Sequence, residues 1–177
     1  QWLAEHAPES AAWLHWGSTT QDAVDTANVL LTQSAMRQLL GSLDGLCAQL
    51  ERLAREHAAT PMMARSLMQP AQVTSFGFKC AQMAHALRRS YAHLQSHAVL
   101  DFNVQLGGAV GNRASLGAAA SAVEQALARR LNLGVAGGAW HTQREPWMRV
   151  GMEVAVLCGS LAKLAKAFKV PTILTSV

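Results

Sequence analysis

The sequence is poor in charge, in strand-favouring residues and in cysteine. Only 15% of its 177 residues are charged, against about 25% in an ordinary soluble domain, and isoleucine and tyrosine occur once each. Three cysteines are too few for a disulfide scaffold. No apolar run approaches the ~18–20 residues that a membrane span needs, and an apolar content of 50% excludes intrinsic disorder.

Helix-favouring residues dominate the rest of the composition. Alanine and leucine account for 32 and 23 residues, and both lose little conformational freedom in a helix. Apolar residues recur at alternating spacings of three and four in four segments, which is typical of helices packed in a bundle. The sequence therefore predicts one all-α domain over residues 1–177, a long-helix bundle of about 70–80% helix without a sheet. Its first long helix is predicted to run from about Thr20 to His57.

The charge balance suits a small anionic ligand at least as well as nucleic acid. The net charge is +4, and the basic residues occur singly or in pairs, with no run and no interleaved aromatics. The low charged fraction has two interpretations: partner chains cover much of the surface, or the composition is simply rich in alanine. Cys47, Cys80 and Cys158 each lie in a helical apolar pattern, which predicts buried thiols in a reducing, cytoplasmic compartment.

Four segments between the predicted helices differ from plain connections. Each is dense in polar residues, glycine or tryptophan, whereas a simple connection needs only a few turn residues. In an otherwise apolar bundle, we expect function to lie in such loops. The segments cover residues 15–21, 60–73, 103–114 and 134–146.

The first of these loops reads His-Trp-Gly-Ser-Thr-Thr-Gln-Asp over residues 15–22. Three hydroxyl residues, with an acid three residues after Thr19, are typical of a helix N-cap or capping box. The alternative is an anion site, because hydroxyls, free backbone N–H groups and the positive end of a helix converge there. His15 beside them is able to donate a proton or a hydrogen bond.

The other three loops each offer a different ligand group. Arg65 can bind a carboxylate through two parallel hydrogen bonds, with an ordinary surface arginine as the equal alternative. Glycines in Gln-Leu-Gly-Gly-Ala-Val-Gly-Asn at 105–112 allow a close approach of the backbone to a ligand, but no strand or Lys-Ser/Thr pair supports a phosphate loop. His141 and Arg144, in Trp-His-Thr-Gln-Arg-Glu at 140–145, are able to form a site beside a tryptophan.

Two further patterns do not point to a site. His93 and His97 are four residues apart on a predicted helix, but the segment offers no acid to complete a zinc site, so we predict no metal. Serine, histidine and aspartate are all present without the Gly-x-Ser-x-Gly motif of a serine hydrolase.

Taken together, the four loops resemble the fumarase/aspartase superfamily over roughly residues 1–168. Residues 15–22 resemble its first signature and 60–69 its second, while 105–112 and 140–145 are most similar to the bacterial 3-carboxy-cis,cis-muconate cycloisomerase branch. The resemblance implies a homotetramer of long helices without cofactor or metal, with active sites drawn from three subunits. It also implies lactonisation of 3-carboxymuconate to 4-carboxymuconolactone, a step in the catabolism of aromatic compounds through protocatechuate and β-ketoadipate.

The resemblance also indicates which residues form the site. A carbanion stabilised by a neighbouring carboxylate needs cations and hydrogen-bond donors around it. His15 and His141 are the candidate catalytic residues. The candidate residues for binding a polycarboxylate substrate are Ser18, Thr19, Thr20, Arg65, Ser66, Gln69, Gln105, Asn112 and Arg144. We expect eight of these side chains to face one polar cleft, to which more than one subunit contributes: His15, Ser18, Thr19, Thr20, Arg65, Ser66, Gln69 and His141.

The sequence departs from the superfamily pattern at three places. Leu67 stands where many lyase relatives carry a catalytic histidine, which argues against an adenylosuccinate- or argininosuccinate-type lyase, and Asn112 replaces a threonine of the third loop. The serine-loop pattern Gly-Ser-Ser-x-Met-Pro-x-Lys-x-Asn is absent from the 177 residues. We therefore expect the central part of a longer enzyme, without its N-terminal domain and C-terminal region and inactive alone. A lyase of that type and a non-catalytic helical assembly module are the alternatives.

Overall fold

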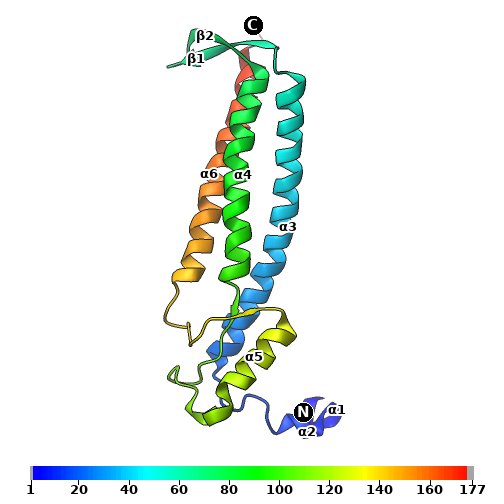
Figure 1. The fold of residues 1–177 in the computed structure, drawn as a ribbon, viewed down its shortest axis with the longest axis vertical. Coiled ribbons are helices and arrows are strands. Elements are labelled where there is room, and N and C mark those ends of the chain that lie inside the picture. The colour runs from blue at the N-terminus through cyan, green and yellow to red at the C-terminus, as the bar shows by residue number, and fades with distance from the viewer. Residues whose placement is uncertain (1, 175–177) are drawn as a thin grey trace. The chain divides into compact units, whose positions relative to one another are not determined.

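The computed structural model describes residues 2–174, with all side chains except those of residues 3, 99 and 169–174. Helices make up 67% of the chain, slightly less than predicted, and Figure 1 shows their order. The helices are α1 (Trp2–His6), α2 (Pro8–Ala11), α3 (Thr20–Glu56), α4 (Phe76–Leu100), the 3-10 helix η1 (Ala114–Ala119), α5 (Ala120–Leu131) and α6 (Glu145–Leu174). The strands are β1 (Pro61–Ser66), β2 (Gln69–Ser75), β3 (Asn103–Val104) and β4 (Gly134–Val135).

The chain forms two compact units, which are described separately. The first consists of the residues up to Ala35 together with His97–Met148, and the second of Met36–Ser96 together with the residues from Arg149 onward. The first long helix, predicted from Thr20 to about His57, is observed as Thr20–Glu56. The 37 residues contain no proline to break the helix, and its buried residues from Val29 to Leu50 are apolar and helically spaced.

In the second unit, parts of α3, α4 and α6 lie side by side (Figure 1). The predicted apolar stripes face one another, with Leu43 and Leu50 of α3, Leu87 of α4 and Leu157 of α6 buried. Polar contacts along the edge join the same helices: Arg88 of α4 donates to carboxylates of α3, and Lys79 Nζ of α4 donates to the Ala167 carbonyl of α6. The stripe positions were predictable because they depend only on local helical spacing.

Residues 60–73 were expected to form an irregular loop in a protein without a sheet, and that expectation is wrong. They belong to a two-stranded antiparallel hairpin of β1 and β2, closed by pairing of Ser66 with Gln69. The two turn residues, Leu67 and Met68, have φ angles of +49° and +63°. Such a turn normally carries Asn-Gly, because most side chains disfavour the left-handed conformation, so the sequence gives no hairpin signal here.

The first unit surrounds a small aromatic core. Phe102, Val104 and Trp140 are buried, and the Trp140 Nε1–H donates to the Val104 carbonyl at 2.9 Å. The strands β3 and β4 pair in parallel over two residues each, a second departure from the predicted absence of a sheet. Two-residue strands are too short to produce a period-2 pattern in the sequence.

The cysteines differ in exposure, contrary to the prediction that all three are buried. Cys47 and Cys80 are buried in the second unit, whereas Cys158 is exposed. Burial raises the pKa of both the Cys47 and the Cys80 thiol. Cys158 directly follows the buried Leu157 on α6, and one residue along a helix rotates the side chain about 100° away from the apolar stripe.

Over the described part of the chain, no helix is both long and apolar enough to span a membrane.

Candidate active site

The start of α3 has the geometry of a capping box. The backbone N–H of Thr19 donates to Asp22 Oδ2 at 2.9 Å, which is the return bond from the cap residue to the acid three positions on. The Ser18 hydroxyl donates to the carbonyl of His15 at 3.1 Å. His15 has a left-handed backbone with φ +65° and an exposed side chain. The helix-start interpretation therefore describes this loop correctly, while its role toward an anion stays a prediction.

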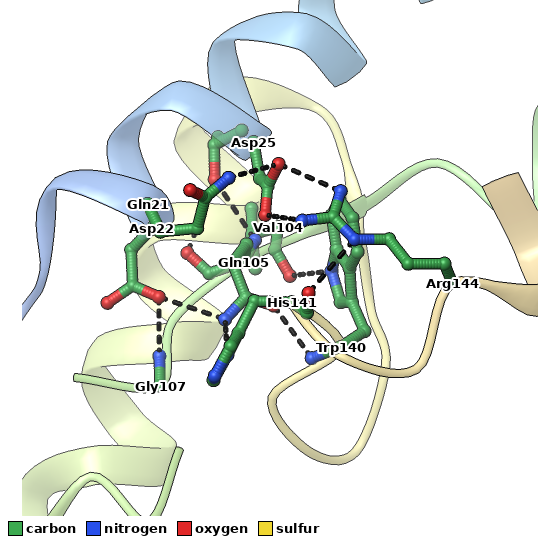
Figure 2. A network of polar contacts seen from close by, with 10 residues as sticks. Gln21, Asp22, Asp25, Val104, Gln105, Gly107, Trp140, His141 and Arg144 are labelled. Atoms are coloured by element: carbon green, nitrogen blue, oxygen red, sulfur yellow. Dashed lines mark hydrogen bonds and ion pairs between the residues drawn. The ribbon is translucent and has the colours of Figure 1, made fainter. Parts of the chain in front are cut away.

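Asp22 also binds a second loop. Asp22 is only 2% exposed, and its side chain accepts hydrogen bonds from the Gln105 carboxamide and the backbone N–H of Gly107 at 2.9 and 3.0 Å (Figure 2). It also accepts from the backbone N–H of Gly108 at 2.9 Å. Burial alone would raise the pKa of Asp22, but these three bonds and the one from Thr19 outweigh it, so the pKa lies below its ordinary value. Asp22 is therefore an ionised carboxylate that ties residues 105–108 to the start of α3.

Gln105 is the centre of the polar network in Figure 2. Its Oε1 accepts from the backbone N–H of Trp140 at 2.7 Å, and its Nε2 lies 2.9 Å from Asp22 Oδ1 and 3.1 Å from His141 Nδ1. Its backbone N–H donates to the Thr26 hydroxyl, which in turn donates to the Gln105 carbonyl. With 1% of the residue exposed, all four polar groups of Gln105 bond to the protein itself.

Arg144 forms a bidentate ion pair with Asp25 of α3. Its two terminal nitrogens lie 3.0 and 2.8 Å from the two carboxylate oxygens, and its Nε–H donates to the His141 carbonyl at 2.9 Å. The guanidinium also stands 5.4 Å from the Trp140 ring centroid. Arg144, predicted to bind substrate, is thus committed to holding the 140–144 segment against α3.

Two glycines of the 105–112 loop make room for this network. A Cβ on Gly107 would stand 2.7 Å from the Ala139 side chain and 3.1 Å from Gln105 Nε2. A Cβ on Gly111, whose φ is +82°, would stand 3.2 Å from His141 Cε1. Glycine at these positions therefore lets the backbone lie close to side chains of the same chain. The sequence had predicted a close approach to a ligand instead.

The first unit thus brings together three of the four polar loops. Asp22 joins residues 15–22 to the glycine loop, and Gln105 joins that loop to His141. Asn112, predicted to bind substrate, is exposed, and its Oδ1 accepts from the Ala114 backbone N–H at 3.1 Å.

The remaining predicted residues lie in the second unit, on the hairpin. Ser66 pairs with Gln69 and Arg65 with Pro70, so Arg65, Ser66 and Gln69 flank the same turn. All three are exposed. Among the residues that the structure describes, Arg65 forms no ion pair. That these side chains share one cleft with those of the first unit stays a prediction.

Comparison with known protein families shows which family the chain belongs to. Residues 2–168 match a family described as lyase. The chain belongs to this lyase family, within the fumarase/aspartase superfamily. The matched span agrees with the resemblance over roughly residues 1–168.

Two of the similar proteins differ in the activity that their names give. The lyase chain is 39% identical over 157 residues to trans-aconitate decarboxylase 1 of Mycosarcoma maydis, covering 89% of this chain and 32% of that protein. It is 35% identical over 164 residues to 3-carboxy-cis,cis-muconate cycloisomerase of Bradyrhizobium diazoefficiens, covering 93% and 36% respectively. The chain therefore spans about a third of the length of these relatives.

A solved structure shares the fold of the lyase chain. The 3-carboxy-cis,cis-muconate lactonizing enzyme of Pseudomonas putida superposes with a TM-score of 0.87 at 35% identity, covering 93% of this chain and 37% of that one. A likeness of this size supports the long-helix class predicted from the apolar spacing.

Some residues that build the polar network of the first unit were not predicted. Asp25 and Thr26, both buried on α3, hold Arg144 and Gln105. Asp25 and Thr26 follow Asp22 by three and four residues, which places all three on one face of the helix. This spacing is the signal that could have revealed them. Arg113, which follows the glycine loop, forms an ion pair with the buried Glu124 of α5.

The two histidines considered as a metal pair bind acids individually. His97 Nδ1 lies 2.6 Å from Asp101 Oδ2, and His93 Nδ1 lies 3.4 Å from Glu153 Oε2. No group of three His, Cys, Asp or Glu side chains within residues 2–174 is arranged to hold a metal ion.

Proposed function

We propose that the chain is the central part of a 3-carboxy-cis,cis-muconate cycloisomerase. The observation that carries the proposal is the convergence of the three polar loops of the first unit around Asp22, Gln105 and His141, in a chain at 35% identity to enzymes of that name. An aromatic-catabolic role and a cytoplasmic location belong to the same proposal.

The substrate is a tricarboxylate, which sets a charge requirement. Removing carboxylates from water costs several kcal/mol for each charge left unpaired. The hydroxyls of Thr19 and Thr20, at the positive end of α3, supply donors for one carboxylate, whereas the Ser18 hydroxyl already donates to the His15 carbonyl. Because Arg144 is committed to Asp25, the available cation of the predicted set is Arg65. Arg65 belongs to the hairpin, and in the proposal the hairpin of one subunit completes the site of another.

The proposed reaction is an isomerisation. A carboxylate oxygen of the substrate adds to one carbon of a conjugated double bond, and a proton is delivered to the neighbouring carbon. One C–O bond and one C–H bond form while the C=C π bond is lost. Starting from the carboxylate the step takes up one proton, so substrate and product have the same atoms when both are counted in their acid forms. Negative charge develops next to a carboxylate, where hydrogen-bond donors stabilise it. His15 and His141 are the candidates for moving or positioning the proton, with no cofactor or metal.

A second candidate follows from the 39% identity to trans-aconitate decarboxylase 1. Trans-aconitate is also a tricarboxylate with a carbon–carbon double bond conjugated to a carboxylate, so the same donors and cation suit it. An adenylosuccinate- or argininosuccinate-type lyase is less favoured, because Leu67 has no group that transfers a proton.

The experiment is an ultraviolet assay on the longer gene product that contains this chain. Loss of the conjugated diene absorbance of 3-carboxymuconate supports the proposal. Release of CO2 from trans-aconitate with no diene loss overturns it in favour of the second candidate. Arg65→Ala should weaken substrate binding at least about tenfold, the value of one charged hydrogen bond. His93→Ala is the control and should leave activity unchanged, because His93 lies outside the proposed site and its ring nitrogen faces Glu153.

A further inference from the structure

We propose that Gln105 is a positioning residue that holds His141 as a neutral imidazole with its proton on Nε2. The inference rests on the proposed function, in which His141 faces the substrate. It assigns to Gln105 a different task from the substrate binding that the sequence predicted. It also specifies how His141 acts, as a hydrogen-bond donor through Nε2.

The orientation of the Gln105 carboxamide is fixed by groups whose hydrogen-bonding roles cannot be exchanged. The backbone N–H of Trp140 can only donate, so the Gln105 atom 2.7 Å away must be the oxygen. The ionised Asp22 carboxylate can only accept, so the atom 2.9 Å from its Oδ1 must be the NH2 nitrogen. Turning the amide over would place two donors together at Trp140 and two acceptors together at Asp22.

The amide nitrogen then determines the state of His141. One of its two hydrogens points to Asp22, and the other is available to His141 Nδ1 at 3.1 Å. A neutral imidazole has one nitrogen with a hydrogen and one without. Because a donor faces Nδ1, Nδ1 is the acceptor and the ring hydrogen is on Nε2.

The Gln105 side chain is also held rigidly in place. Thr26 binds both its backbone N–H and its carbonyl, and Gly107 leaves no side chain to displace the amide. With 1% of its surface exposed, Gln105 cannot turn to solvent or reach a substrate. A positioning residue must be fixed more firmly than the group that it orients, and His141 is only half-buried.

The free edge of the His141 ring lies next to Gly111. A Cβ at Gly111 would be 3.2 Å from Cε1 and 3.9 Å from Nε2, so glycine keeps this edge uncovered. The Nε2–H can therefore donate to a substrate oxygen on which negative charge develops. A neutral donor of this kind stabilises the charge without itself transferring a proton to carbon.

The test is the tautomer itself, measured by long-range 1H–15N NMR of the histidine side chains of this chain. The chain has seven histidines, and the signal of His141 is identified as the one that disappears in His141→Asn. In the wild-type chain at neutral pH, Nδ1 of His141 should show the shift of a nitrogen without hydrogen, and Nε2 that of a protonated one. A ring protonated at Nδ1 overturns the proposal without any further variant.

Gln105→Glu tests the cause. A carboxylate can only accept, so His141 is expected to move its hydrogen to Nδ1 or to become doubly protonated. Gln143→Glu is the matched control, because it introduces the same charge at an exposed position two residues from His141 and should leave the tautomer unchanged. If Gln105→Glu leaves the His141 signals as in the wild type, or if Gln143→Glu changes them equally, Gln105 does not set the tautomer.

Activity is measured separately on the longer gene product. Gln105→Glu should lower kcat about a hundredfold, the typical effect of losing one donor to developing charge, with a much smaller change in KM. Equal kcat in Gln105→Glu and wild type overturns the role of the tautomer in turnover. If the wild type shows no activity on 3-carboxymuconate, the proposed function fails, whereas the NMR result still decides the tautomer.

Discussion

Asp22 accepts four hydrogen bonds from two loops while buried in the first unit, and this arrangement has a measurable consequence for stability. Asp22→Asn replaces one acceptor oxygen by an NH2 group that faces backbone N–H donors. We expect the free energy of unfolding to fall by about 2–4 kcal/mol, since hydrogen bonds to a buried charge are costly to lose. Asp44→Asn, at an exposed carboxylate, should cost less than about 1 kcal/mol. Equal losses in denaturant titrations would contradict this account.

The same side chain makes stability depend on pH. The pKa of Asp22 in the folded state lies below its ordinary value of 3.8. A lowered carboxyl pKa means that the unfolded chain binds the proton more tightly, so the contribution is complete above pH 3.8 and is lost as the pH falls through the folded pKa. The difference in unfolding free energy between wild type and Asp22→Asn should be constant from about pH 7 to 5 and shrink below pH 3.8. A difference that grows on acidification has the wrong sign for this mechanism.

The cysteine thiols provide a second test of the environment of single residues. Cys47 and Cys80 are buried, and their pKa values are raised by burial, so both stay protonated and inaccessible at neutral pH. In a Cys158→Ser chain, a thiol reagent should label neither cysteine under native conditions and both after unfolding in denaturant. Rapid labelling of the native variant would show that the core of the second unit opens readily.

Among the elements, the hairpin combines a strained turn with exposed apolar side chains. Leu67 and Met68 are 95% and 87% exposed, and both have left-handed backbones, which cost about 1 kcal/mol or more each for such residues. The double substitution Leu67→Asn with Met68→Gly should therefore stabilise the hairpin by about 1–2 kcal/mol, measured by hydrogen exchange of β1 and β2.

The control for the hairpin is Leu67→Ala with Met68→Ala. It removes the same exposed side chains without supplying residues that favour the left-handed conformation, and should give no gain in protection. If both pairs of substitutions protect the strands equally, side-chain exposure rather than turn strain is responsible.

The same elements explain which features the sequence predicts. Helices α3, α4 and α6 were predictable because their apolar residues repeat at a local spacing that needs no knowledge of partners. The hairpin was missed because Leu67 and Met68 are unusual in its turn. The network around Gln105 was missed in part because the bonds of Gln105 join residues 35–83 positions apart in sequence, and nothing local reveals such a pairing. The glycine loop and His141 were each singled out from the sequence, as separate candidate ligand groups. In the structure, the groups that they contact are other residues of the chain.

For the whole molecule, charge and exposure together favour self-association. Only 15% of the residues are charged, and Met152 and Val156, one turn apart on α6, are 66% and 57% exposed. Exposed apolar residues that line up along a helix are typical of an interface between chains. We therefore predict that the chain forms a homo-oligomer, and in the proposed enzyme a tetramer, with this face of α6 covered.

Sedimentation velocity at micromolar concentration tests the assembly. Met152→Glu with Val156→Glu should shift the wild-type oligomer to smaller species, because burying two unpaired carboxylates in an apolar interface costs several kcal/mol. Ser121→Glu with Gln125→Glu adds the same charges one turn apart at exposed polar positions of α5 and should leave the oligomer intact. Circular dichroism should show equal helix content in all three proteins, so that a shift reflects association rather than unfolding. A monodisperse wild-type monomer would contradict the prediction, and would remove the route by which Arg65 of one subunit reaches the site of another.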